Sequence, residues 1–354
     1  MTKLGSGPLS AAKEKPIDPQ ALESLGQARQ ALREQIGRII IGQEQIIDDL
    51  LTAIFARGHC LMVGVPGLAK TLMVQTIASA IDLKFNRIQF TPDLMPADIT
   101  GTEVIETDRT TGERVFKFVH GPVFANIVLA DEINRTPPKT QAALLQAMQE
   151  RQVTSGGQTY DLPRPFFVLA TQNPIEQEGT YPLPEAQLDR FMFMLKVGYP
   201  SPAEELAIAK TTTVDADIAI SKVLGAQDIL DLQKMIRQVP VSDHVAMYCV
   251  KLGRSTRAED AIAPAFIKEY VTWGVGPRAI QYLVIGAKAR AALRGEYNVT
   301  VQHVKEVAPL VLRHRMIPNF HAEAEGVDTD ALVARLLKEV SEPTPEEYEK
   351  LATT

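Results

Sequence analysis

A short glycine-containing segment near residue 64 constrains this 354-residue chain most strongly. It reads Gly64, Val65, Pro66, Gly67, Leu68, Ala69, Lys70 and Thr71, between an apolar run at residues 60–63 and a helical pattern at residues 70–81. A glycine-rich turn from a strand into a helix places backbone N–H groups and a helix N-terminus next to phosphates. The segment therefore predicts a phosphate-binding loop in an α/β protein with a parallel sheet.

The loop predicts binding of ATP together with Mg²⁺. Lys70 would reach the β- and γ-phosphates, Thr71 would ligate Mg²⁺, and Leu72 would complete the nucleotide contacts. Ala69 stands where the usual pattern has Gly, and we expect its methyl to be tolerated through a negative φ at the helix start. The alternative is a glycine-rich turn that binds nothing.

Two further apolar runs end in polar residues. The run at residues 127–130 ends in Asp131 and Glu132, which suit a Mg²⁺ ligand followed by a base that activates water. The run at residues 166–171 leads to Asn173, which could orient the attacking water. Taken alone, these residues also fit a solvated strand terminus and an Asn-Pro turn. Next to the phosphate loop, we favour the catalytic interpretation.

Two arginines are candidates for stabilising charge in the transition state. Arg190 lies between apolar neighbours and suits the γ-phosphate, although an ion pair with Asp189 or Glu185 is the alternative. Arg278 follows Gly276 and Pro277 at the start of a helix, where a capping salt bridge is equally plausible.

The length of the chain favours two domains, because one hydrophobic core usually stops growing at roughly 250–300 residues. A boundary is expected near residues 198–202, where Ser201 and Glu204 have the spacing of a helix capping box. Helical periodicity dominates beyond it. We predict a disordered lead-in at 1–20, an α/β core at 21–199, a smaller all-α lid domain at 200–345 and a tail at 346–354.

Composition excludes several classes of protein. The sequence holds no apolar run near the ~20 residues that a membrane span needs. The two cysteines, Cys60 and Cys249, are far apart, which indicates neither a disulfide scaffold nor a zinc site and favours the cytoplasm. The net charge of −6 makes nucleic acid an unlikely partner.

Taken together, these motifs resemble those of MoxR-type ATPases of the AAA+ superfamily, in the clade with a helix 2 insert, from about residue 39 to residue 320. The residues that carry the resemblance are Ile41-Gly42-Gln43, the phosphate loop, Gly121-Pro122-Val123-Phe124, Ala130-Asp131-Glu132-Ile133-Asn134-Arg135, Ala170-Thr171-Gln172-Asn173-Pro174 and residues 183–191. The resemblance implies a P-loop NTPase fold with a helical lid domain.

The resemblance also implies a role for each site residue. Ile41 and Gly42 would lie near the adenine, Lys70 and Thr71 would be Walker A, and Asp131 and Glu132 would be Walker B. Asn173 would be sensor 1, Arg190 an arginine finger that enters the next subunit's site, and Arg278 the sensor 2 arginine. Gly276 departs from the small hydroxyl residue that the family usually has two positions before the sensor 2 arginine.

By the same resemblance, the chain would form a ring, expected to be a hexamer, that hydrolyses ATP to remodel, activate or insert a metal or cofactor into a protein client. A separate protein with a von Willebrand factor A domain would be a partner. Residues 96–122 would be the helix 2 insert and residues 153–160 a hairpin, and both would face a ring pore or client. The alternative for these two segments is ordinary surface loops with no role in client binding. The alternatives are a nonhydrolysing nucleotide switch or scaffold and, less favoured, a nucleic-acid motor.

Overall fold

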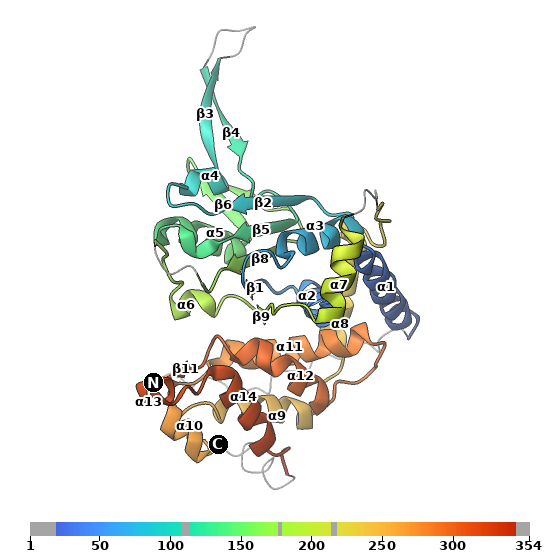
Figure 1. Cartoon of the computed structure of the whole chain (residues 1–354). Coiled ribbons are helices and arrows are strands. Elements are labelled where there is room, and N and C mark those ends of the chain that lie inside the picture. The colour runs from blue at the N-terminus through green and yellow to red at the C-terminus, as the bar shows by residue number, and fades with distance from the viewer. Residues whose placement is uncertain (1–18, 108–113, 176–178, 214–217, 345–354) are drawn as a thin grey trace, which may run out of the picture.

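A five-stranded parallel sheet forms the centre of the first part of the molecule (Figure 1). The computed structural model describes residues 19–107, 114–175, 179–213 and 218–344, so most of the expected lead-in and all of the expected tail lie outside it. The strands follow the order β2-β5-β8-β1-β9. Their bounds are Phe85–Gln89 (β2), Ile127–Asp131 (β5), Phe167–Gln172 (β8), Cys60–Val63 (β1) and Phe193–Lys196 (β9).

The central strands are buried on both faces, as their uninterrupted apolar runs indicate. Leu61, Val128 and Val168 point into a core beneath one face, whereas Cys60 and Leu169 point into a second core beneath the other. Parallel pairing aligns the carboxyl ends of β1, β5 and β8 at a single edge of the sheet. Polar residues that follow these strands in the sequence are therefore neighbours in space.

Helices pack around the sheet. The first part of the chain contains α1 (Pro19–Gly37), α2 (Glu44–Ala56), α3 (Lys70–Ala80), α4 (Pro96–Thr100), α5 (Pro138–Glu150) and α6 (Glu185–Leu188), with the 3₁₀ turn η1 (Ile133–Arg135). The second part contains α7 (Pro202–Thr211), α8 (Ala226–Gln238), α9 (Asp243–Arg254), α10 (Ala265–Tyr270), α11 (Pro277–Leu293), α12 (Val301–Leu312), α13 (Phe320–Glu325) and α14 (Thr329–Glu339). A small ribbon of β10 (Val271–Trp273) and β11 (Ile317–Pro318) accompanies them. This is the expected P-loop NTPase fold followed by a helical lid domain.

The change from sheet to helices occurs where the capping signal lies. Ser201 caps α7: its hydroxyl accepts from the Glu204 N–H at 3.4 Å, while the Glu204 carboxylate accepts from the Ser201 N–H at 2.7 Å. The two parts remain tightly joined, because a buried ion pair links Arg290 of α11 to Asp49 of α2. Within the described residues, no helix is both long and apolar enough to cross a lipid bilayer.

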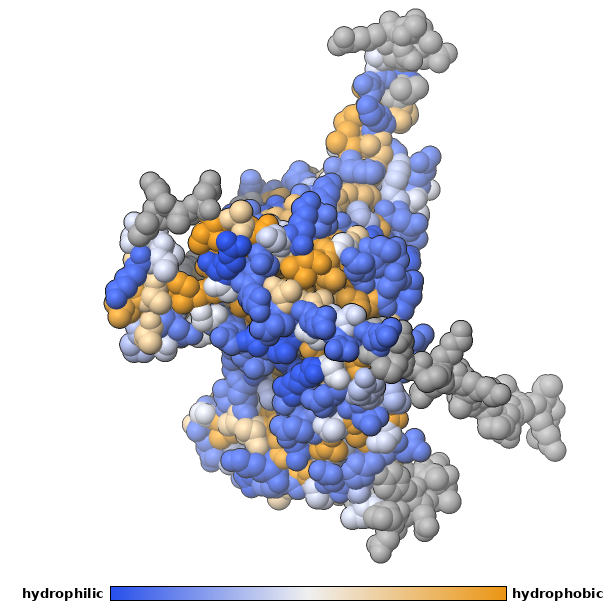
Figure 2. Space-filling view, turned by 90° about the vertical axis from the view of Figure 1, so that its right-hand side faces the viewer, coloured by the Kyte–Doolittle hydropathy of each residue, from blue (hydrophilic) through white to orange (hydrophobic). Residues whose placement is uncertain are grey.

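Two antiparallel hairpins leave the sheet domain. The longer hairpin pairs β3 (Gly101–Thr107) with β4 (Arg114–His120) and projects from the end of the molecule opposite the lid helices (Figure 1). Apolar residues are exposed on it, seen as orange atoms on the projection in Figure 2; they are Val104, Ile105, Phe116 and Val119. The shorter hairpin pairs β6 (Gln152–Ser155) with β7 (Gln158–Asp161). Thr110, Thr111 and Gly112, which belong to the expected insert, lie outside the described residues.

Candidate nucleotide-binding site

A cavity of about 420 Å³ lies at the carboxyl edge of the sheet. It brings together residues from four separate parts of the sequence: the phosphate loop with α3, strand β2, the end of β5 and the end of β8. The side chains that line it are Pro66, Gly67, Leu68, Ala69, Lys70, Thr71, Leu72, Arg87, Asp131, Glu132, Thr171 and Asn173. Gly64 and Val65 precede this lining at the start of the loop. The edge of an α/β sheet at which strands end is where such folds bind ligands.

Hydrogen bonds to the backbone fix the Lys70 side chain inside the phosphate loop. Its ammonium donates to the carbonyl oxygens of Gly64 and Val65, the latter at 3.2 Å. Burial lowers the pKa of Lys70, and the nearby charges of Asp131 and Glu132 oppose that shift. Because the lysine is half-buried and bound only to neutral carbonyls, a phosphate in the cavity would be a stronger acceptor for its proton donors.

The expectation of a negative φ for Ala69 is wrong. Ala69 precedes α3 with φ 53° and ψ 22°, which is the left-handed region. A methyl-bearing residue costs roughly 1–2 kcal/mol in this conformation, which is why Gly usually occupies it. The Ala69 carbonyl accepts from the Met73 N–H at 2.9 Å, so the helix begins directly at this left-handed residue.

Asp131 is a buried carboxylate with defined partners on both oxygens. Arg87 of β2 donates to Oδ2 through Nε at 3.0 Å and through Nη2 at 2.6 Å. The Thr171 hydroxyl donates to Oδ1 at 2.6 Å and accepts from the Glu132 N–H at 2.9 Å. A carboxylate has about four acceptor positions, so Oδ1 can still accept one further bond.

Glu132 occupies a strained position next to the cavity. Its φ of 57° is left-handed, and non-glycine residues in this region concentrate at functional sites. Its Oε2 accepts from Gln89 at 3.1 Å and from Arg135 at 3.0 Å. The side chain expected to activate water is therefore engaged with two donors from its own chain.

Asn173 and Thr71 complete the polar lining of the cavity. Asn173 is buried, and its Oδ1 accepts from the Ile175 N–H at 3.1 Å, which fixes the side chain. Thr71 is the second residue of α3, directly after Lys70, and lines the same cavity. The Thr71 hydroxyl and the Asp131 carboxylate are hard oxygen donors, and Mg²⁺ bound with a nucleotide uses one or two such side chains plus phosphates and water. The residues present fit this ion.

Ile41 and Gly42 lie in a separate cavity of about 390 Å³, which is bounded by α1 and the start of α2. Gly42 has φ +70°, and a Cβ there would lie 2.0 Å from a carboxylate oxygen of Glu204. Ile41 and Gly42 thus do not line the phosphate cavity. Its contact with the adenine stays a prediction.

Arg190 and Arg278 do not line the phosphate cavity either. Both line a cavity of about 170 Å³ together with Arg57 and Arg151. Arg190 precedes β9, so it lies at the amino edge of the sheet, opposite the edge where the phosphate loop follows β1. Arg278 donates to Asp189 at 3.1 Å. Asp189 is thus paired with Arg278 and not with Arg190, the partner that the sequence left open as an alternative.

A buried lid arginine fixes the loop that carries Arg190. Arg315 donates from Nε to the Asp189 carboxylate at 2.8 Å and from Nη2 to the Asp189 carbonyl at 2.9 Å. The Arg190 side chain itself has no hydrogen bond or ion pair within the described part of the chain. The lid thus holds the backbone on both sides of a free guanidinium group.

Sequence reasoning missed three polar residues of the site. Arg87 and Gln89 lie on β2, an edge strand with alternating polar residues that carried no apolar signal. Thr171 lies inside a motif that was recognised, but its bonds to Asp131 and Glu132 require the pairing of β5 with β8. A polar side chain one position from a strand end, on the strand next to Asp131, is the signal that could have found it.

Comparisons with known proteins agree with this geometry. The profile of the ATPase family associated with various cellular activities (AAA) matches residues 59–193, and that of the AAA lid domain matches residues 263–336. Chaperone MoxR1 of Mycobacterium tuberculosis is 44% identical over 309 residues, covering 87% of this chain and 81% of that protein. Protein MoxR of Paracoccus denitrificans is 31% identical over 312 residues, covering 84% and 90%.

A solved structure agrees as well. The crystal structure of a candidate ATPase from Cytophaga hutchinsonii superposes with a TM-score of 0.85 at 40% identity, and the match covers 92% of this chain and 98% of that one. Both the sheet domain and the lid domain are thus shared. The chain belongs to the MoxR family of AAA+ ATPases.

Proposed function

We propose that this chain hydrolyses ATP with Mg²⁺ and uses the energy to change the conformation of a protein client. One observation carries the proposal: Lys70, Thr71, Asp131, Glu132 and Asn173 line one cavity at the carboxyl edge of the sheet. These are the donors, metal ligands and base that phosphoryl transfer to water requires. A turn that binds phosphate without catalysis would need only Lys70 and Thr71.

The roles follow from the chemistry of each side chain. Lys70 would leave the loop carbonyls and donate to the β- and γ-phosphates, while Thr71 and Asp131 would hold Mg²⁺, which neutralises phosphate charge when bound. Glu132 would take a proton from the attacking water, which requires its release from Arg135 and Gln89. Asn173 would orient that water.

Assembly into a ring is part of the proposal, with a hexamer as the expected form. Arg190 lies at the edge of the sheet opposite its own phosphate cavity, so it can act on a nucleotide only in another copy of the chain. Remodelling, activation or metal insertion are the expected forms of work in the cytoplasm. A separate protein with a von Willebrand factor A domain is the expected partner, and the exposed apolar residues of β3 and β4 are a candidate surface for a client.

A nonhydrolysing nucleotide switch is the second candidate, and a specific contact favours it. Glu132 is paired with Arg135 at 3.0 Å, which would withhold the base if nucleotide did not break the pair. The two functions differ in turnover and not in binding. Nucleotide affinity alone therefore cannot separate them.

The test is the steady-state ATPase rate measured against protein concentration. We expect the rate per chain to rise with concentration, because each site would need an arginine from a neighbour. Glu132→Gln should keep ATP affinity and lose turnover, while Lys70→Ala should lose binding by roughly 10² or more, as two charge-assisted hydrogen bonds are removed. A rate that is flat with concentration and equal in Glu132→Gln would reject hydrolysis at this site and favour the switch.

A further inference from the structure

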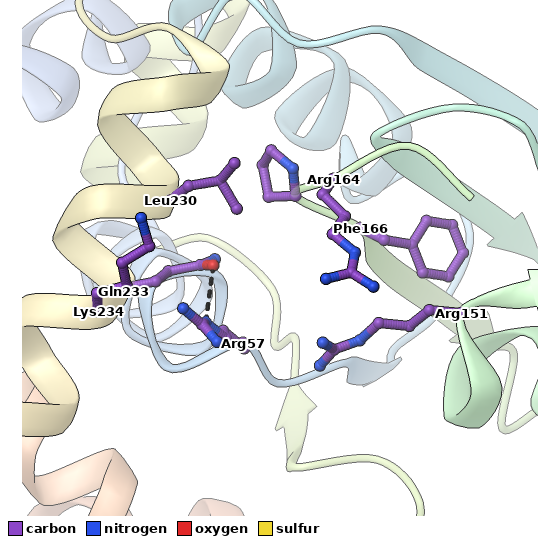
Figure 3. A pocket seen from close by; sticks show the side chains of 8 residues that line it. Arg57, Arg151, Arg164, Phe166, Leu230, Gln233 and Lys234 are labelled. Atoms are coloured by element: carbon purple, nitrogen blue, oxygen red, sulfur yellow. Dashed lines mark hydrogen bonds between the residues drawn. The ribbon is translucent and has the colours of Figure 1, made fainter. Parts of the chain in front are cut away.

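A second cavity rich in arginine lies at the amino edge of the sheet, next to the one that contains Arg190. It has a volume of about 250 Å³, and we call it the arginine pocket. Figure 3 shows the guanidinium groups of Arg57, Arg151 and Arg164 directed toward the same space, with Lys234 and Gln233 on α8 along one side. Among the described residues, no Asp or Glu lines this pocket.

The three guanidinium groups have no carboxylate partner. The side chains of Arg151 and Arg164 make no hydrogen bond or ion pair with any described part of the chain, and the Arg57 side chain donates only to the neutral Gln233 side chain, at 3.1 Å. Lys234, by contrast, pairs with Asp231 at 2.8 Å. A chain with a net charge of −6 thus collects three uncompensated positive charges at one place.

The positive charges of these arginines disfavour one another. Burial lowers the pKa of Arg57, and the charges of Arg237, Arg151 and Arg164 lower it further. Burial also lowers the pKa of Arg151, followed by the charges of Arg164 and Arg237. Each shift has the sign expected when cations are confined near one another without an anion, and an anion in the pocket would reverse the coulombic part.

Ordinary helix capping explains only part of the arrangement. Arg57 follows α2 and Arg151 follows α5, and a cation at a helix C-terminus interacts favourably with the carbonyl end. Both residues, however, have left-handed backbones, with φ 61° and φ 56°, where Gly is the favoured residue. Arg164 belongs to neither helix, and capping does not explain its direction toward the other two.

The lining favours a small ligand that accepts hydrogen bonds. The Gln233 amide is already engaged on both atoms, since its oxygen accepts from Arg57 and its nitrogen donates to the Ile54 carbonyl at 2.7 Å. The remaining polar groups are donors, and the volume is below the roughly 300–1,000 Å³ of pockets for larger ligands. Planar guanidinium groups match phosphate oxygens in pairs. We propose that the arginine pocket binds an oligophosphate anion.

Two sources could supply this anion. A free oligophosphate would act as a separate ligand of each chain. Alternatively, the triphosphate could come from a nucleotide bound by a second copy, because Arg57 and Arg151 line both the arginine pocket and the cavity of Arg190. Only this second source rests on the proposed function.

The first experiment is calorimetric titration of the full-length Lys70→Ala chain with sodium tripolyphosphate, which avoids competition from the phosphate loop. We expect one saturable site per chain, weakened by salt. Arg151→Gln and Arg164→Gln should each weaken it about tenfold or more, because each removes a charge-assisted contact. Arg164→Lys should lose less than Arg164→Gln. Arg114→Gln, an exposed arginine on β4, is the matched control and should bind as the parent chain does.

Three results would overturn the proposal: no saturable binding of tripolyphosphate, equal binding in the Arg164→Gln and Arg114→Gln chains, or binding of an oligoglutamate peptide without binding of tripolyphosphate. The last result would make the pocket a site for acidic peptides. Arg164 is exposed, so its substitution tests binding without removing a buried side chain.

A second experiment separates the two sources by sedimentation velocity of Glu132→Gln chains with ATP and Mg²⁺. If a second copy supplies the triphosphate, Arg164→Gln should weaken ATP-dependent assembly. If the ligand is free, assembly should be unchanged while the calorimetric site persists. Failure of ATP-dependent assembly in every chain would count against the proposed function and leave the calorimetric result standing.

Discussion

The two edges of the central sheet differ in whether their positively charged side chains have partners within the chain. At the carboxyl edge, Arg87 pairs with Asp131 and Lys70 donates to loop carbonyls, so each cation has an internal partner. At the amino edge, the guanidinium groups of Arg164 and Arg190 have no partner within the described residues. The chain therefore completes its charge pairing at one edge and leaves it incomplete at the other.

This difference indicates what each edge requires. At the carboxyl edge the positively charged side chains already have partners in the same chain, so the cavity does not depend on a ligand for its stability. A phosphate that binds there would replace weak acceptors with stronger ones. A surface with uncompensated arginines gains most from an anion that the same chain does not supply. We infer that the carboxyl edge is a binding site within one chain and that the amino edge is half of a site between chains or a site for a separate anion.

The largest effect is expected from removing Arg190, which lies at the amino edge and which we propose acts on the phosphate of a nucleotide in a neighbouring chain. Arg190→Ala should lower the ATPase rate by roughly 10³ to 10⁵ if it stabilises transition-state charge in a neighbour's site. Nucleotide affinity should change little, because Arg190 does not line the phosphate cavity. Turnover and affinity for a fluorescent ATP analogue should be measured together.

Arg114→Ala provides the control for that experiment, since it removes an exposed arginine from β4 and should leave turnover unchanged. Retention of the full ATPase rate in Arg190→Ala would contradict the inference that the amino edge forms half of a site between chains. Equal loss of affinity and turnover would instead place Arg190 in its own chain's site.

Much of the carboxyl edge was predictable from the sequence, because each part has a local signal. Asp131, Glu132 and Asn173 each follow an apolar run, and parallel strands bring such positions together. The contacts of Arg87 were not predictable, since β2 lacks the apolar run that reveals a buried strand. A contact that depends on an edge strand needs the register of the sheet.

The arginine pocket was not predictable for a different reason. Arg57 and Arg151 each look like ordinary basic residues at the end of a helix, and Arg164 looks like a loop residue. Their shared feature is the absence of a carboxylate, which becomes visible only when all neighbours in space are known. Sequence patterns reveal residues that belong to a local motif. They do not reveal residues that are notable because no carboxylate lies near them in space.

A moderate effect is expected from acid, because His59 is buried beside the amino edge. Its Nδ1 accepts from the Val168 N–H at 3.0 Å, and its Nε2 lies 3.2 Å from the Met148 carbonyl, which fixes a neutral ring. Burial lowers the pKa of His59 to about 4 from 6.5, a Met148 bond opposes the shift and the Arg151 charge adds to it. The unfolded chain therefore takes up a proton first as the pH falls.

This residue should contribute stability that is present above pH 6.5 and is lost as the pH falls toward 4. Between pH 7 and pH 5 the free energy of unfolding should fall by about 2 kcal/mol on its account. Urea unfolding at the two pH values would measure the loss. His59→Gln should fall less steeply, although not to zero, because burial also lowers the pKa of His314. Exposed His321→Gln should keep the full slope, and identical slopes for both variants would refute the assignment.

The smallest effect is expected at the carboxyl edge, from Ala69→Gly. Relief of the left-handed Ala69 backbone is worth roughly 1–2 kcal/mol, while Gly adds about 0.4–1 kcal/mol of unfolded-chain entropy to be lost. Urea unfolding should therefore show a stabilisation of about 0.5–1 kcal/mol. Ala209→Gly, at an exposed position of α7, is the matched control and should destabilise by about 1 kcal/mol. If both variants destabilise the chain equally, the phosphate loop carries no strain at Ala69. The backbone of the carboxyl edge would then be relaxed without a ligand, as its paired charges are.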